Sequence, residues 1–273
     1  MNSNKKTYKR ALTSAGSDPS GGAGIQADLK TFSACGCFGT SAIVAVVDEN
    51  TVGVTGVHPV PVDFVVGQIR SVLDDIGAGA VKGGRLPCSE LVGAVRAPLA
   101  RYDIRTVVLD PVMVATSGDP LLQQEAVATL RDELIPRVRV ITPNIPEAEI
   151  LLGRKLPRQE ELPDAARELS QGGRVSVFLK AGHLDDDELV DIFYNAESDE
   201  VIPLRSKRIR TVNTHGTGCT LSSAIAAFLA RGFALNEAAA RAKEYIAEAI
   251  AAGAAYDIGH GHGPVHHFYR FWE

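Results

Sequence analysis

"RTVVLDPVM" (residues 105–113) is the stretch that decides the predicted fold. Val107, Val108 and Leu109 are consecutive apolar residues, and a carboxylate, Asp110, follows them directly. Unbroken apolar runs of this kind are typical of strands that are buried on both faces of a sheet. Comparable strand candidates are "RALTSAG" (10–16), "SAIVAVV" (41–47), "GAGAVKGG" (77–84), "VRVITPN" (138–144) and "VSVFLKAG" (175–182).

Helical patterns lie between these strand candidates. In residues 24–36, Ile25, Leu29 and Phe32 fall on one helical face, and Gly36 is a typical helix stop. Further helices are predicted at residues 63–77, where Phe64, Ile69, Val72 and Leu73 recur at helical spacing, and at residues 124–136, 162–173, 221–232 and 235–256.

The alternation of strands and helices predicts an α/β protein with a mostly parallel sheet and helices on both faces. Residues 188–195 and 200–209 break the rhythm and predict an antiparallel hairpin. Because no linker or repeat interrupts residues 1–273, we expect a single domain. Ligands of such sheets bind beyond the carboxyl ends of the strands, where the unusual loops of this sequence also fall.

Charge and composition limit the partners that the protein can have. A formal net charge of -5 and the lack of a Lys/Arg stripe argue against nucleic acid. No segment approaches the roughly 18 to 20 apolar residues of a spanning helix, and no signal-peptide pattern follows the N-terminus. We therefore expect a cytoplasmic protein with no membrane partner. A reducing compartment also suits the four cysteines, Cys35, Cys37, Cys88 and Cys219.

"NTHGTGCT" (213–220) carries the richest chemistry. It precedes an alanine-rich helix, and N–H groups at a helix start attract anions and can stabilise charge in a transition state. The Cys219 thiol could attack a substrate or take a proton from a hydroxyl, or it could be a small buried residue. A nucleophile would need a histidine partner, and the sequence leaves the direction of His215 open. The four N–H groups that could converge are those of Gly216, Thr217, Gly218 and Cys219.

Carboxylates follow two of the predicted strands. Asp110 ends one strand, and Asn144 and Glu147 follow the next one. Mg²⁺ with a nucleotide typically takes one or two protein carboxylates plus phosphate oxygens and water. The alternative for Glu147 is a first-turn glutamate that the helix dipole favours. No His/Cys set has zinc spacing, so a transition-metal site is the weaker alternative.

Two further segments stand out. "AGSDPSGGAGIQAD" (15–28) leaves a strand and opens a helix, so it could hold oxygens of a ligand or form a tight turn. It matches neither GxGxxG nor the P-loop pattern. The tail "GHGHGPVHHFYRFW" (259–272) holds four histidines, which suggests a metal. Because its neighbours are glycine, proline and aromatic residues, we expect a structural tail that packs on the body.

Taken together, the motifs resemble the hydroxymethylpyrimidine/phosphomethylpyrimidine kinases of thiamine biosynthesis, members of the ribokinase-like superfamily, over residues 10 to 270. The resemblance implies a three-layer α/β/α sandwich, ATP and Mg²⁺ as cofactors, and a homodimer. It implies phosphorylation of 4-amino-5-hydroxymethyl-2-methylpyrimidine and of its monophosphate to the diphosphate. The motifs are "GSDPSGGAGIQADLKTFSA", "ENT.GV", "DPVM..SGD.L", "ITPNIPEAE.LLG", "LKAGHL", "NTHGTGCTLSSAIAA" and "GHGHGPVHHF".

The resemblance also implies roles for individual residues. Cys219 matches the catalytic base, and Gly216, Thr217 and Gly218 match an anion hole beside it. Asp110 and Glu147 match the positions linked to Mg²⁺. The nucleotide would contact Lys180, Asn144 and Thr214, and the substrate would contact Gly16, Asp18, Glu49, Gly84, Arg85 and Val112.

Two residues depart from the family pattern, both on the substrate side. Glu49 stands where the family usually has a glutamine that touches the pyrimidine, and Arg85 stands in place of a methionine. We expect Glu49 and Arg85 to lie close enough to pair, which would offset the cost of each charge in a small pocket. The alternative is an Arg85 that points to solvent.

Three other functions stay open at this point. A pyridoxal or pyridoxine kinase would use a related fold, and a binding protein could keep the fold without turnover. A hydrolase with Cys219 as nucleophile is the third. The full set of phosphate-side residues, Asp110, Glu147, Lys180 and Cys219, favours a kinase over a mere binder.

Overall fold

A computed structural model describes residues 6–86, 88–113 and 124–272. In this part of the chain nine strands form one sheet in the order β3-β2-β1-β4-β5-β6-β7-β8-β9. Strands β2, β1, β4, β5, β6 and β7, in this order across the sheet, pair in parallel. Strands β3, β8 and β9 pair antiparallel to their neighbours. The strands are β1 Arg10–Gly16, β2 Phe38–Glu49, β3 Val54–Pro59, β4 Ala80–Gly83, β5 Val107–Leu109, β6 Val140–Ile141, β7 Ser176–Leu179, β8 Glu188–Asn195 and β9 Glu200–Lys207.

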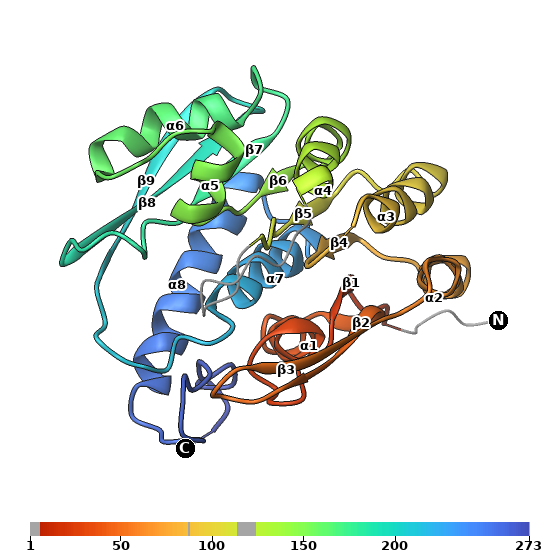
Figure 1. Cartoon of the computed structure of the whole chain (residues 1–273), viewed down its shortest axis with the longest axis horizontal. Coiled ribbons are helices and arrows are strands. Elements are labelled where there is room, and N and C mark those ends of the chain that lie inside the picture. Colours follow the sequence, from red (N-terminus) through yellow and green to blue (C-terminus); the bar gives the residue numbers. More distant parts are fainter. Residues whose placement is uncertain (1–5, 87, 114–123, 273) are drawn as a thin grey trace.

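Helices cover both faces of the sheet (Figure 1). One face carries α1 Gly24–Ala34, α7 Thr217–Ala230 and α8 Leu235–Gly253. The other face carries α2 Val62–Asp75, α3 Ser89–Arg101, α4 Gln124–Thr129, α5 Ile145–Leu152 and α6 Leu162–Leu169. The α/β/α sandwich and the antiparallel β8–β9 hairpin that the sequence predicts are therefore confirmed.

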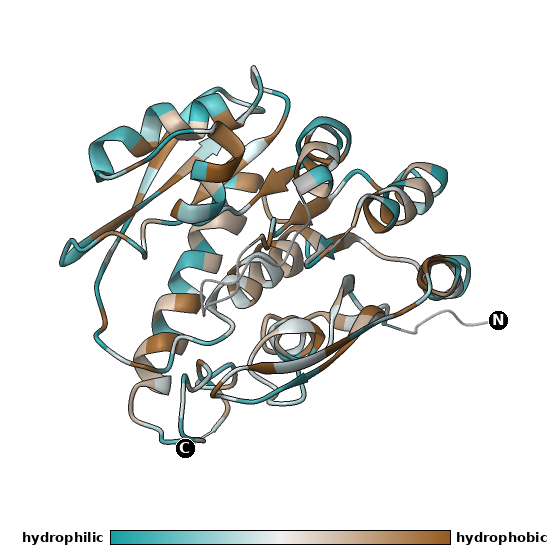
Figure 2. Ribbon diagram, in the orientation of Figure 1, coloured by the Kyte–Doolittle hydropathy of each residue, from teal (hydrophilic) through white to brown (hydrophobic). Residues whose placement is uncertain are grey.

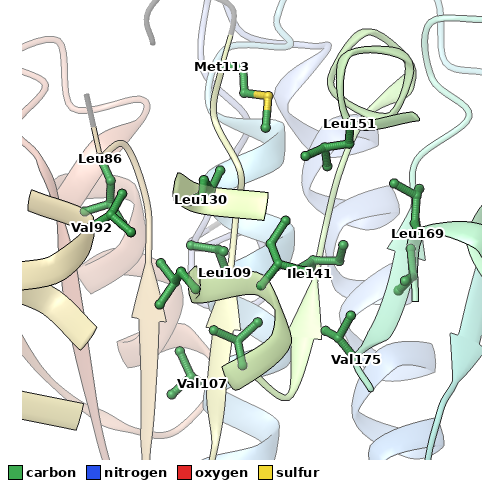
Figure 3. Packing of buried hydrophobic residues seen from close by; sticks show 14 of the residues in the cluster. Leu86, Val92, Val107, Leu109, Met113, Leu130, Ile141, Leu151, Leu169 and Val175 are labelled. Carbon is green, nitrogen blue, oxygen red and sulfur yellow. The ribbon is translucent and has the colours of Figure 1, made fainter. Parts of the chain in front are cut away.

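The alternating direction of side chains along the central strands explains why their sequences are largely apolar. In β5, Val107 and Leu109 join the core under α3 and α5, and Val108 joins the opposite core under α7 and α8. Successive side chains of a strand point to opposite faces, so burial on both faces favours apolar residues at every position and admits a polar one mainly where it has a partner. Figure 3 shows Leu109 and Ile141 of neighbouring strands on the same side as Leu130. Hydropathy follows the same division, with brown central strands and teal outer helix faces (Figure 2).

Several elements differ from the sequence prediction. The edge strand β3 was not expected because its side chains are largely exposed and carry little apolar signal. The helix α3 contains Pro98, and α5 is only eight residues long, so neither has a clear periodic pattern. In α2 Val65, not Phe64, faces the core, and Phe64 is 65% exposed.

The helix predicted at residues 124–136 is divided into three parts. It runs as α4, a π-helical turn at Leu130–Leu134 and a 3₁₀ turn at Ile135–Arg137. A further 3₁₀ turn at Gln159–Glu161 leads into α6. Among the described residues, no helix is both long enough and apolar enough to pass through a lipid bilayer.

Candidate active site

A cavity of about 620 Å³ lies beyond the carboxyl ends of the parallel strands. Every predicted site residue except Gly84 lines it. Gly84 is buried behind the wall, where an added Cβ would lie 3.0 Å from the ammonium nitrogen of Lys82. The "SGD" part of the resemblance (117–119) lies outside the described residues. The residues that the sequence places after strands, and those that the resemblance adds, thus line one cavity.

The start of α7 forms one wall of the cavity. Gly216 precedes the helix with φ 79°, and a Cβ there would overlap the carbonyl oxygen of Gly22. Only glycine combines that conformation with so close an approach of two backbones. The Thr217 amide donates to Thr214 O at 3.3 Å and so is not free for an anion. Within the described residues no protein acceptor binds the amides of Gly216, Gly218 and Cys219, which leaves three donors of the predicted four.

The Cys219 side chain lines the cavity in the first turn of α7. Burial raises the pKa of its thiol to about 11, while the nearby Lys82 ammonium acts in the opposite direction. The Asp28 and Asp110 carboxylates add to the effect of burial. In the free protein the sulfur is therefore a neutral thiol at pH 7.

Lys180, at the end of β7, joins the two carboxylates that follow β5 and β6. Its Nζ lies 3.3 Å from Asp110 Oδ1 and 3.9 Å from Glu147 Oε2. Asp110 also accepts a hydrogen bond from Thr142 Oγ1 at 3.1 Å. Both carboxylates are 2% exposed, so this ammonium is the cation that offsets their buried charge.

Glu147 also caps α5. It is the third helical residue, and its Oε2 accepts a hydrogen bond from the Asn144 amide at 2.8 Å, while Asn144 Oδ1 accepts one from the Glu147 amide at 2.9 Å. The helix-start role that the sequence left as an alternative is thus present together with a place in the cavity. Burial raises the pKa of Glu147 to about 7, although the charge of Lys180 opposes it.

The residues present fit a magnesium ion that arrives with a nucleotide. Asp110 and Glu147 offer carboxylate oxygens on one side of the cavity, which are the hard ligands that Mg²⁺ prefers. Within the described residues no group of three or more His, Cys, Asp and Glu side chains is arranged to hold a metal ion by itself, so phosphate oxygens and water would complete the coordination.

A second buried lysine–aspartate pair lies under Cys219, and sequence reasoning missed it. Lys82 of β4 donates to both carboxylate oxygens of Asp28 at 2.9 Å, and both side chains are fully buried. Asp28 also accepts hydrogen bonds from Thr13 at 2.6 Å and Ser223 at 2.7 Å. Ser223 lies one turn after Cys219 on the same face of α7, so the pair supports that face. The available signal was a lysine inside an otherwise apolar strand.

His215 points toward the first loop of the chain rather than toward Cys219. Its Nε2 lies 2.9 Å from Asp18 Oδ2, and its ring packs against Gly22. Asp18 in turn accepts hydrogen bonds from the amides of Ser20, Gly22 and Ala23. The hydrolase hypothesis therefore loses the partner that a cysteine nucleophile needs.

The expected pair of Glu49 and Arg85 does not form. Both side chains line the cavity, but no ion pair within 4.0 Å joins them, and Arg85 Nε is buried without a hydrogen-bond partner among the described residues. The basic group nearest to Glu49 is the imidazole of His215, whose Nε2 lies 3.9 Å from Glu49 Oε1. Arg85 is half-buried and lines the cavity, which disfavours the solvent-facing alternative.

The histidine-rich tail packs on the body, as expected. His262 N donates to Thr51 O at 2.8 Å, and His215 N donates to Gly263 O at 3.0 Å. The His267 ring is buried and lies 3.1 Å from Thr220 Oγ1. These contacts hold the loop before α7 and the first turn of the helix, which contains Cys219.

Solved structures with this fold include a nucleotide complex. A pyridoxal kinase from Bacillus subtilis in complex with ADP has a TM-score of 0.88 and 36% identity, and the match covers 97% of this chain and 100% of that one. The crystal structure of phosphomethylpyrimidine kinase from Clostridium difficile 630 has a TM-score of 0.78 and 41% identity, covering 90% and 100% of the two chains. The fold and the cavity thus define an ATP-dependent kinase of the ribokinase-like class.

The sequence comparison narrows this class. The family model described as phosphomethylpyrimidine kinase matches residues 18–266. The hydroxymethylpyrimidine/phosphomethylpyrimidine kinase of Escherichia coli (strain K12) is 48% identical over 263 residues, which are 96% of this chain and 98% of that protein. The chain belongs to the phosphomethylpyrimidine kinase family.

Proposed function

We propose that the protein phosphorylates 4-amino-5-hydroxymethyl-2-methylpyrimidine and then its monophosphate, with ATP, in thiamine biosynthesis. The observation that carries this proposal is the single cavity that Cys219, Lys180, Asp110 and Glu147 line together. The family and the 48% identical relative support the pyrimidine as substrate.

The cavity has room for two reactants, with the nucleotide on one side of the α7 start and the pyrimidine on the other. Leu189 of β8, Ile209 after β9 and Ile246 of α8 line the cavity at the β8–β9 end of the strand order and suit the flat base of a nucleotide. Asp18, Glu49 and Arg85 lie at the ends of β1, β2 and β4, toward the other end of that order, and we assign this part of the cavity to the pyrimidine ring. The γ-phosphate would then lie near the free amides of Gly218 and Cys219. Phosphoryl transfer depends mostly on such positioning and on charge neutralisation.

We assign the phosphate side of the site as follows. Lys180 would bind phosphate oxygens, with Asn144 and Thr214 beside it, and Asp110 and Glu147 would hold Mg²⁺. The metal would supply neutralisation of the phosphate charge. Cys219, in its thiolate form, would accept the proton of the substrate hydroxyl while the α7 amides bind the transferred group.

Release of ADP tests the proposal directly. We expect turnover with the hydroxymethylpyrimidine and with its monophosphate, measured at equal enzyme concentration by a coupled assay. Pyridoxal in a third arm tests the alternative function, which the fold similarity to pyridoxal kinases favours. Turnover with pyridoxal and none with either pyrimidine would reverse the assignment.

Replacement of Glu147 tests the metal assignment. Glu147→Gln should raise the Mg²⁺ concentration for half-maximal rate by about 10- to 100-fold, because a carboxylate ligand is lost. Glu149→Gln is a matched control on the same helix, since Glu149 pairs with Lys155 at the surface. An unchanged Mg²⁺ dependence in Glu147→Gln would contradict the assignment.

We also propose a single-domain, cytoplasmic homodimer with neither nucleic acid nor membrane as partner. One continuous sheet supports the single domain, and free thiols at all four cysteines suit a reducing compartment. For the dimer, the support is an exposed apolar edge at β2 and β3, where Val46, Val54 and Val57 are 41–52% exposed (Figure 2). Light scattering should give about twice the chain mass of 29.0 kDa.

A further inference from the structure

At the substrate end of the cavity, the imidazole of His215 lies close to two carboxylates, those of Asp18 and Glu49. His215 Nε2 lies 2.9 Å from Asp18 Oδ2 and 3.9 Å from Glu49 Oε1. All three side chains line the cavity, and the side chains of Asp18 and Glu49 are 1% and 18% exposed. The single nitrogen is in hydrogen-bond range of Asp18 alone.

Asp18, not Glu49, is the hydrogen-bond partner of His215 Nε2. Three backbone amides donate to its carboxylate, from Ser20, Gly22 and Ala23, in addition to His215. Although burial acts the other way, these donors hold the pKa of Asp18 well below its usual range. Asp18 therefore stays ionised, and the hydrogen bond with His215 is charge-assisted when the ring is protonated.

Glu49 is left without a cation of its own. The charged groups that face it are Asp18 from the β1–α1 loop, His215 from the loop before α7, and Arg85 after β4. Burial, and then the Asp18 charge, raise the pKa of Glu49, while His215 and Arg85 act against this more weakly. In the described part of the chain Glu49 forms no ion pair shorter than the 3.9 Å approach to His215.

The substrate ring presents a pattern that an ionised carboxylate cannot complement. The exocyclic amine of a 4-aminopyrimidine donates a hydrogen bond, and the neighbouring ring nitrogen accepts one. An ionised glutamate has acceptors only, whereas a protonated glutamate has one donor and one acceptor. A proton on the ring nitrogen gives the same complementarity, because the ring edge then donates twice to a carboxylate.

We propose that Glu49 makes substrate binding proton-linked, so that the pyrimidine binds together with one proton from solvent shared between Glu49 and the amine-bearing edge of the ring. This inference rests on the proposed function. Because binding takes up a proton, the affinity for the pyrimidine falls as pH rises above the pKa values of free Glu49 and free ring. The limiting slope is about tenfold in affinity per pH unit.

Calorimetry of pyrimidine binding at pH 8.5 tests the proposal. Titrations in phosphate and in Tris, which differ in ionisation enthalpy, give the number of protons bound. We expect uptake of about one proton per pyrimidine by the natural protein and none by Glu49→Gln, whose amide offers a donor and an acceptor at any pH. Glu244→Gln, an exposed glutamate of α8, is the matched control and should keep the uptake.

Steady-state kinetics give an independent readout. The KM for the pyrimidine should rise between pH 7 and pH 9 in the natural protein and stay flat in Glu49→Gln, while the KM for ATP follows neither pattern. Proton uptake that persists in Glu49→Gln would overturn the inference, as would binding without uptake in the natural protein. If the pyrimidine neither binds nor turns over, the proposed function itself fails.

Discussion

Cys219→Ala should lower kcat for the pyrimidine by about 10²- to 10⁴-fold, the usual contribution of a positioned acid–base group. The KM for ATP should change little, because the sulfur lies at the α7 start and not at the apolar end of the cavity. Burial raises the thiol pKa to about 11, so the thiolate fraction grows with pH throughout the neutral range. We therefore expect kcat of the natural protein to rise from pH 7 to pH 9, and this rise to be missing in Cys219→Ala.

A second cysteine offers a matched control. Cys88 precedes α3 outside the cavity, so Cys88→Ala should keep both kcat and its pH dependence. Steady-state assays of both variants from pH 7 to pH 9 give the kcat values to compare. Full turnover by Cys219→Ala would show that the sulfur takes no part in proton transfer.

Lys82→Met should lower the free energy of unfolding by about 3–5 kcal/mol, because it leaves the Asp28 carboxylate buried without its cation. The pair is fully buried, and two hydroxyl groups complete the network around Asp28. Denaturant unfolding followed by circular dichroism measures the loss. The double variant Lys82→Met with Asp28→Leu should recover much of it, because no unpaired charge is left in the core.

A surface pair provides the contrast. Lys155 is 85% exposed and pairs with Glu149 at 2.7 Å, so Lys155→Met should change stability by less than about 1 kcal/mol. If Lys82→Met also stays within that limit, the Lys82–Asp28 pair is not what stabilises the floor of the site.

Sequence alone predicts the centre of the sheet and the β8–β9 hairpin well, but it misses the edge strand β3. The central strands are buried on both faces, so Val107, Val108 and Leu109 must all be apolar, and this constraint is visible in the letters. The edge strand β3 has few buried positions and therefore leaves no such pattern. Similarly, the eight-residue helix α5 is defined by its capping box with Asn144 and Glu147 more than by an apolar stripe.

For the site, the order of loops and strands predicts which residues meet but not where their side chains point. Residues after strands converge at one edge of the sheet, and this places Asp110, Glu147 and Lys180 together. The direction of the His215 side chain depends on its bond to Asp18, which lies 197 residues earlier in the chain. The failed pairing of Glu49 with Arg85 has the same cause, because side-chain direction is settled by tertiary packing.

The packed tail has a consequence for how the molecule is made. His215 N is bonded to Gly263 O, and Asn213 Nδ2 is bonded to Gly253 O, so the loop before α7 needs the final helix and the segment after it. Ribosomes deliver these residues after the strands of the sheet, and domains generally fold as the chain emerges. A nascent chain can therefore complete the inner strands while its binding wall is still missing. Incompletely synthesised chains would then bind neither the nucleotide nor the pyrimidine, and binding would become possible in one late step of folding.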